Sequence, residues 1–202
     1  MCRIWNREGA GLAIDKKVFI VVLVVGILLV TGLLVVLAYN GAVTKEQTVD
    51  QTLSQIKNRY KTKLDILPAL LTQVDGYKIY ESSLLTNITE LRTRWMTEIN
   101  SNASTEALAN TSAHLDQNLT QIVLTWENYP VLTADSIVSQ YMGEVVNQNE
   151  QLAYARGQYN GAVQDYNSFI RSFPNNVFTG SFGFAQKSYW GTELPDGGAL
   201  NL

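Results

Sequence analysis

The sequence has very few of the residues on which most enzyme and metal sites depend. Its 202 residues include one cysteine, Cys2, and one histidine, His114. A single cysteine excludes a disulfide within the chain. The residue three before His114 is Thr111, so the Glu-x-x-His motif of di-metal helical bundles is absent. A Ser-His-Asp triad would have to use His114, for which we expect a solvated position on a polar helix. We therefore predict no enzyme activity, no catalytic residue, no metal and no cofactor.

Glycine and charge are distributed in ways that argue against other functions. The glycines at 180–183 and 197–198 lack the strand–turn–helix context of a phosphate or dinucleotide loop, and no Gly-x-Ser-x-Gly turn occurs. Charged residues make up 16% of the chain, against about 25% in ordinary soluble proteins. A net charge of -3 gives no basis for a nucleic-acid partner. Uncharged polar residues, densest from Thr86 to Thr125, fit an extracytoplasmic surface.

One long hydrophobic run, residues 18–38, contains no charge. A helix of this length spans about 31 Å, close to the roughly 30 Å hydrocarbon core of a bilayer. The pattern predicts a transmembrane helix that contacts lipid. A cleaved signal peptide is the main alternative, but it would have a shorter apolar core and a small-residue cleavage site. A pilin-type leader would place its processing site directly before the run, where Asp15-Lys16-Lys17 stands.

The flanking charges predict the orientation. Arg3, Arg7, Lys16 and Lys17 precede the run, and Lys45 is the sole cation in the 18 residues after it. The positive-inside rule places residues 1–17 in the cytoplasm and the rest outside. The four Asn-x-Ser/Thr triplets agree with that side, although such triplets also arise by chance; the candidate glycosylation sites are Asn87, Asn102, Asn110 and Asn118. Cys2 precedes the apolar run, so we interpret it as a free thiol, with intermolecular pairing or acylation as alternatives.

The remaining sequence predicts a bundle of three or four antiparallel helices over residues 39–190, followed by a flexible tail at 191–202. Apolar residues recur every three or four positions through 49–74, 84–99, 107–126 and 137–170. The first of these helices continues directly from the membrane span. Pro68 should kink or restart it. The last stripe is Ile137, Tyr141, Val145, Leu152, Ala155, Tyr159, Ala162 or Val163, Tyr166 and Ile170, and Thr133 or Asp135 caps that helix.

Polar breaks and aromatic residues predict how the bundle ends. Residues 100–104 and 129–131 end the second and third helices, and residues 173–176 end the last one. Five aromatic residues after position 177 suggest a plug that packs back on the bundle. Arg156 on the last helix is interpreted either as part of an internal network or as a surface ion pair; its candidate partners are Asp50, Asp65, Asp75 and Asp165.

One pentapeptide, Tyr-Asn-Gly-Ala-Val, occurs twice, at 39–43 and at 159–163. Glycine permits close helix approach, and tyrosine places its ring in the core. We hypothesise that the first and last helices pack side by side through these copies, unless the repeat is a coincidence. The proposed packing residues are Tyr39, Asn40, Gly41 and Val43 in the first copy, and Tyr159, Asn160, Gly161 and Val163 in the second.

These features together resemble the LemA family over about residues 18–190. The resemblance is most specific in the last helix and after it, with further matches earlier in the chain. Its signature residues here are Pro68, Gly76, Tyr77, Tyr129, Pro130, Arg156, Asp165, Tyr166, Asn167, Phe173, Pro174, Phe182, Gly183 and Phe184. Residues 64–68 have less arginine than the family pattern, and 101–120 carry no signature. The resemblance implies a helical bundle at a membrane, and it implies no catalytic residues.

The function expected from all this is structural. We expect a scaffolding or self-assembling protein of the cell envelope that binds other proteins or its own copies. The alternative is an adaptor or receptor whose bundle end binds a ligand or a partner protein. A deep polar pocket at the bundle end would favour the adaptor, and a flat apolar patch would favour assembly.

Overall fold

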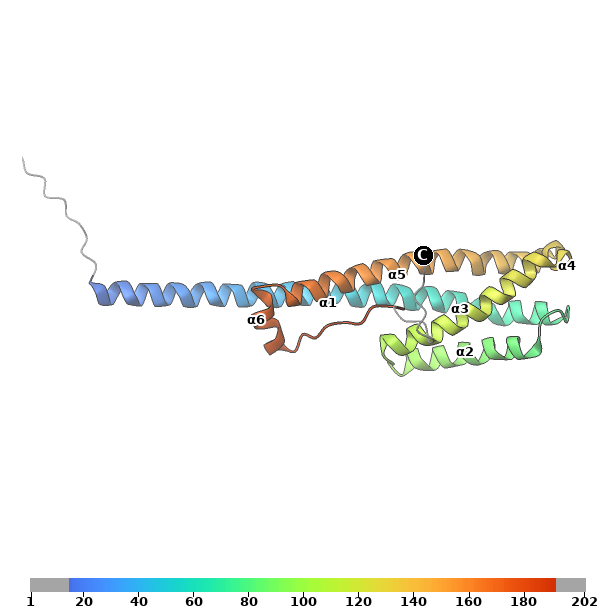
Figure 1. Ribbon diagram of the computed structural model, residues 1–202, viewed down its shortest axis with the longest axis horizontal. Helices are drawn as coiled ribbons and strands as arrows, with labels where there is room; N and C mark the ends of the chain where they lie inside the picture. The colour runs from blue at the N-terminus through green and yellow to red at the C-terminus, as the bar shows by residue number, and fades with distance from the viewer. Residues whose placement is uncertain (1–14, 192–202) are drawn as a thin grey trace, which may run out of the picture.

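The protein is mostly helical over residues 15–191, which are the residues that the computed structural model describes, and these residues form no strand. The long helices are α1 (Lys16–Asp75), α2 (Ser82–Asn100), α3 (Thr105–Asn128) and α5 (Ser136–Arg171). Two short helices, α4 (Pro130–Ala134) and α6 (Asn175–Thr179), and a 3₁₀ turn, η1 (Gly180–Phe182), complete the fold. α1 and α5 lie side by side, and the α2–α3 hairpin packs against their far part (Figure 1). The all-α bundle prediction is confirmed.

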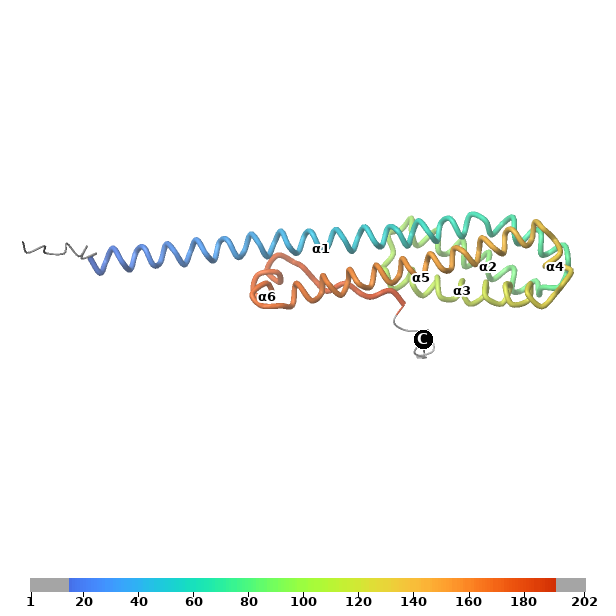
Figure 2. The backbone as a smooth tube through the Cα atoms, turned by 90° about the horizontal axis from the view of Figure 1, so that it is seen from above, coloured from blue at the N-terminus to red at the C-terminus, as the bar shows by residue number. Residues whose placement is uncertain are grey.

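α1 is one unbroken helix of 60 residues, about 90 Å long at 1.5 Å per residue. It begins at Lys16, where the Asp15 carboxylate accepts a hydrogen bond from the Lys17 N–H. Its first part projects beyond the bundle (Figure 2). That part is long and apolar enough to cross a membrane, and no residue of its most apolar 18-residue window is buried. The predicted continuation of this helix into the bundle is confirmed, because α1 has no break between Ala38 and Tyr39.

Pro68 does not restart α1, and this part of the prediction is wrong. The helix continues through Pro68 to Asp75. Proline has no N–H, so it cannot donate to the Leu64 carbonyl four residues earlier. In the structure Arg92 of α2 donates to that carbonyl from Nε at 2.9 Å. A side chain of the neighbouring helix therefore replaces the hydrogen bond that proline removes, which lets the helix continue.

The core follows the predicted stripes with one local error. Val49, Ile56, Leu64 and the matching positions of the later helices are buried. At the start of α5, however, the buried residues are Val138 and Met142, whereas Ile137 is exposed and Tyr141 is only partly buried. Val138, Val145 and Leu152 are spaced by seven, so this stripe keeps a heptad register. The prediction spaced the residues before Val145 by four each, and so selected Tyr141 and Ile137 where the next residues, Met142 and Val138, are buried.

The predicted breaks are present, and of the two candidate caps of α5 the structure uses Asp135. Ser104 accepts a hydrogen bond from the Ala107 N–H at the start of α3, and Asp135 accepts from the Ile137 and Val138 N–H groups at the start of α5. Tyr77, after α1, donates its hydroxyl to the same Asp135 carboxylate. This contact fixes the α1–α2 connection against the start of α5.

Part of the predicted organisation lies outside the described residues. Cys2, Arg3 and Arg7, and nearly all of the predicted tail at 191–202, belong to this group. The division into residues 1–17, 18–38, 39–190 and 191–202 stays a prediction.

Candidate functional site: a polar cluster inside the bundle

The most unusual group in the bundle interior is a lysine. Lys63 lies on the buried face of α1, and its side chain is 0% exposed. Its ammonium group bonds Asp116 of α3 at 2.6 Å and the Asn149 amide oxygen of α5 at 2.5 Å. The lysine therefore joins three helices through one charge. A buried ammonium group without such acceptors would be strongly destabilising.

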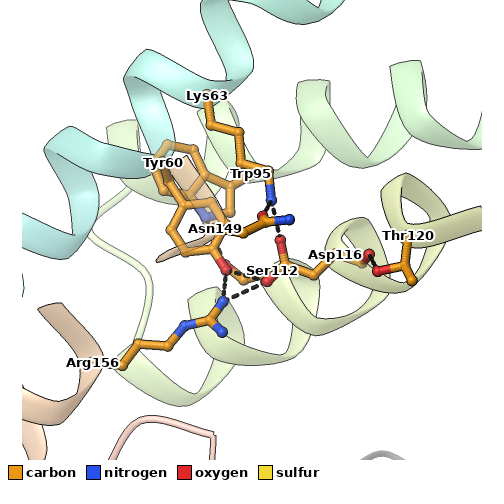
Figure 3. Close-up of polar contacts among 8 residues, drawn as sticks. All are labelled: Tyr60, Lys63, Trp95, Ser112, Asp116, Thr120, Asn149 and Arg156. Atoms are coloured by element: carbon orange, nitrogen blue, oxygen red, sulfur yellow. Dashed lines mark hydrogen bonds and ion pairs between the residues drawn. The ribbon is translucent and has the colours of Figure 1, made fainter. Parts of the chain in front are cut away.

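Asp116 is the centre of the cluster (Figure 3). Its Oδ1 accepts from Lys63, and its Oδ2 accepts from the Tyr60 hydroxyl at 2.7 Å and from Arg156 at 2.5 Å. Arg156 of α5 also donates to the Tyr60 hydroxyl oxygen. Asp116 thus forms ion pairs with two cations, Lys63 and Arg156.

Burial and charge act in opposite directions on this carboxylate. Burial raises the pKa of Asp116, whereas the charge of Lys63 and its hydrogen bond lower it. Burial also lowers the pKa of Arg156. The Asp116 and Arg156 side chains keep 25% and 31% of their surface exposed, so the cluster is closed at Lys63 and reaches solvent at Arg156. The sequence favoured an ordinary surface ion pair for Arg156, and the structure shows the other reading, an internal network. Its partner is Asp116 and none of the four aspartates expected from the sequence.

An aromatic wall encloses the Tyr60 side of the cluster. Trp95 of α2 packs 5.4 Å from the Tyr60 ring and donates its indole N–H to Ser112 at 3.0 Å. On another side Trp190 stacks on Tyr60 at 6.1 Å and also meets the edge of Tyr159. The cluster is therefore placed where α1, the α2–α3 hairpin, α5 and the C-terminal segment all meet.

The C-terminal segment that brings Trp190 to the cluster is residues 185–190, which we call the strap. Two asparagines of α5 hold it. Asn167 donates to the Lys187 carbonyl and accepts from the Lys187 N–H, both at 2.9 Å. Asn160 makes the same pair of bonds to Trp190, at 3.3 and 2.8 Å. Seven helical residues rise about 10.5 Å, and three extended residues cover about 10 Å, so the two spacings match.

The strap also contacts α1 and Tyr159. Lys187 forms an ion pair with Glu46 at 2.7 Å, which raises the pKa of Lys187. The Tyr159 hydroxyl donates to the Ser188 carbonyl at 2.9 Å. The strap thus lies along α1 and α5 and runs from the region of α6 to the near end of the α2–α3 hairpin (Figure 1).

The two copies of the repeated pentapeptide contact different partners. A Cβ on Gly41 would clash with the Phe169 ring of α5 and lie 3.1 Å from its Cε1 atom, so this glycine allows close approach. A Cβ on Gly161 would meet nothing within 4 Å. Tyr39 packs against Phe182 and Phe184, and Val43 is partly buried. Tyr159 and Asn160 hold the strap instead, and Val163 is in the core.

The other sequence-selected residues lie at different places. Tyr166 is buried, Asp165 and Tyr129 are exposed, and Pro130 starts α4. Gly76 follows the end of α1, and Gly183 ends η1 with a φ of 82° that favours glycine. Phe173 is exposed. Of the candidate glycosylation sites, Asn87, Asn102 and Asn110 are exposed and Asn118 is partly buried. His114 is exposed, as predicted.

A groove of about 470 Å³, lined mainly by polar residues, lies on the flank of the bundle between α1 and α5. Its walls include Asn58 and Arg59 from α1 and Glu150, Gln151 and Tyr154 from α5. It runs along the helices and not at the bundle end. Within residues 15–191, no three histidine, cysteine, aspartate or glutamate side chains are grouped so that they could hold a metal.

Sequence reasoning missed Lys63, Asp116 and Asn149. One signal was present: Lys63 lies seven residues after Ile56 and four before Leu67, which places it on the buried stripe. A lysine at such a position requires an acceptor on a facing helix. No comparable signal selects Asp116 or Asn149, because the pairing depends on how three helices are aligned.

Comparison with known proteins agrees with the family resemblance. The model of the LemA family matches residues 52–197, which include the whole polar cluster and the strap. No curated protein matches the chain. The family match and the long apolar start of α1 fit a membrane-associated protein. Because the match covers more than half of its residues, the chain belongs to the LemA family.

Proposed function

We propose that this chain is a non-catalytic, single-pass membrane protein that acts as a scaffold in the cell envelope. Its bundle would stand on the extracytoplasmic side and bind copies of itself or other proteins. The observation that supports this most is the polar cluster: its charged atoms bond one another and hold three helices together. Such an arrangement stabilises a bundle without presenting a reactive group to a substrate.

The geometry of α1 supports a scaffold role. A single helix without a linker joins the apolar segment to the far part of the bundle. The bundle would therefore keep a fixed height and direction relative to the bilayer. Tethering in two dimensions raises the effective concentration of such bundles for one another.

Photocrosslinking in native membranes tests this function. A photoreactive residue would replace Tyr154, Leu124 or Val131, which are exposed on α5, α3 and α4. The expected result is adducts concentrated at one of these positions, either with a second copy or with a defined protein. Detergent-diluted protein is the control, in which adducts should disappear. An absence of adducts at all three positions in native membranes would contradict the scaffold. A stoichiometric bound metal in the purified protein would contradict the non-catalytic part.

The α1–α5 groove gives a specific basis for the adaptor as a second candidate. Its amide, charged and aromatic side chains suit a polar ligand or peptide, and Tyr154 is 70% exposed there. If the adaptor is right, Tyr154→Ala should abolish capture of a native partner while Leu124→Ala, on α3, leaves it unchanged. If the two variants capture partners equally, this groove is not the binding site.

A further inference from the structure

The end of the bundle nearest the apolar part of α1 exposes an uncharged, aromatic segment. No residue between Arg171 and Lys187 is charged, and four of the six phenylalanines of the chain lie there. We call residues 172–184 the foot; it contains α6 and η1. Phe173 is 83% exposed, and Val177 and Phe182 are also exposed. In water, so many exposed apolar side chains on one short segment would favour association with an apolar phase.

The foot lies beside the residues where the predicted span ends. α6 packs against α1, and Figures 1 and 2 both place it at the bundle end from which the apolar part of α1 projects. Tyr39 directly follows the span, and its ring lies 5.3 Å from Phe182 and 5.7 Å from Phe184. Ala38, the last residue of the span, is buried. The foot is therefore at the level at which α1 would leave the hydrocarbon.

The thickness of the lipid headgroup layer determines whether the foot lies in that layer or in water. Headgroups add about 5–8 Å to each side of the hydrocarbon core. Side chains within 6 Å of Tyr39 would fall inside this layer. Tyr39 has the amphipathic ring that is enriched in that layer, and phenylalanine side chains of interfacial segments are buried at its boundary with the acyl chains. Exposed cations at its edge, such as Arg171, suit phosphate headgroups.

We propose that the foot inserts into the headgroup region of the bilayer that α1 spans, as a second and interfacial membrane contact. This inference rests on the proposed transmembrane placement of residues 18–38. The contact would fix the rotation of the bundle about α1, because a single helix alone leaves that rotation free. The foot would then attach the adjoining ends of α5 and the strap to the membrane surface.

Depth-dependent quenching tests the proposal with a matched control. In a Cys2→Ser background, a fluorescent label would be attached to Val177→Cys in the foot or to Val131→Cys at the far end of the bundle. Both valines are 59% exposed, so they differ mainly in position. A label at Leu28→Cys, inside the span, reports the span itself. Each full-length chain would be reconstituted in phosphatidylcholine–phosphatidylglycerol vesicles that contain nitroxide lipids, labelled either near the headgroup or deep in the acyl chain.

The proposal predicts that headgroup nitroxides quench the Val177 label at least threefold more than the Val131 label, and that deep nitroxides quench the Leu28 label. Equal quenching at Val177 and Val131, with Leu28 quenched, would overturn the foot contact and leave the span intact. An unquenched Leu28 label would overturn the span, and the foot contact with it. Unchanged circular dichroism of each labelled chain would show that the bundle is folded.

Discussion

Replacement of Arg92 by methionine should destabilise the bundle through the carbonyl that Pro68 leaves without a helical donor. Arg92 donates to the Leu64 carbonyl at 2.9 Å, and Leu64 is fully buried. A hydrogen bond from a charged donor contributes about 1.5–3 kcal/mol. We expect Arg92→Met to lower the free energy of unfolding by about that amount. Lys78→Met is the control, because the ion pair of Lys78 with Asp75 is exposed on both sides, and we expect it to cost less than about 1 kcal/mol.

The dependence on proline is the sharper part of this prediction. In Pro68→Ala, the alanine N–H can donate to the Leu64 carbonyl, so Arg92 is no longer its only partner. Proline is about 3 kcal/mol less favourable than alanine inside a helix. Alanine also leaves the unfolded chain more flexible, which lowers the stability of the folded state by about 0.4–1 kcal/mol. Pro68→Ala should therefore stabilise the protein. In that background Arg92→Met should cost about 1–2 kcal/mol less than in the native chain.

Urea unfolding of the purified full chain in detergent, followed by tryptophan fluorescence, measures all four variants of this cycle. A lower cost of Arg92→Met in the Pro68→Ala background would support the replacement of the missing hydrogen bond. If Arg92→Met costs the same in both backgrounds, the carbonyl does not couple the two residues and the reasoning is refuted.

Three further predictions concern the cluster, the strap and the cap of α5. Asp116→Ala leaves the buried Lys63 without its anion, so it should lower the free energy of unfolding by about 3–5 kcal/mol in the same assay. An added Lys63→Met should restore part of that loss. A loss below about 1 kcal/mol would contradict the structure. Asn167→Ala should release the strap, seen as faster trypsin cleavage there, and native-like resistance would argue against its role. The Tyr77 hydroxyl, together with two backbone N–H groups, lowers the pKa of Asp135, so the stability from this carboxylate is present above its unfolded pKa and is lost as the pH falls through the lower folded value. Melting temperatures measured from pH 7 to pH 3 should therefore fall less steeply for Asp135→Asn than for the native chain, and parallel curves would contradict this.

The helices were predictable because their signals are local. The apolar run, the three-four spacing around Ile56 and the caps at Ser104 and Asp135 all act within a few residues of the chain. The restart at Pro68 was wrong because the compensating donor, Arg92, is 24 residues away in sequence. Helix propensity alone contains no information about such a partner.

The candidate site was predictable only in part, for the same physical reason. Arg156 was selected, but its partner Asp116 is 40 residues away on another helix. Likewise, Asn160 was proposed for helix packing, whereas its amide holds the backbone of the strap. Asparagines spaced by seven on a helix indicate one face, but not that an extended segment will lie on that face. Alignment between elements, and not local pattern, decides these contacts.

Membrane topology together with contact mapping tests the central claim, a membrane-anchored bundle that works by binding. In a Cys2→Ser background, Tyr154→Cys should react with a membrane-impermeant maleimide in intact cells, and a short-range crosslinker at the same cysteine should then yield one or a few defined protein adducts. In a separate measurement on the native chain, Cys2 should react with the same maleimide only after the membrane is opened. If Tyr154→Cys is protected until the cells are lysed, the orientation is contradicted. If Tyr154→Cys is accessible but remains uncrosslinked, and Leu124→Cys on α3 and Val131→Cys on α4 also remain uncrosslinked, the scaffold is contradicted.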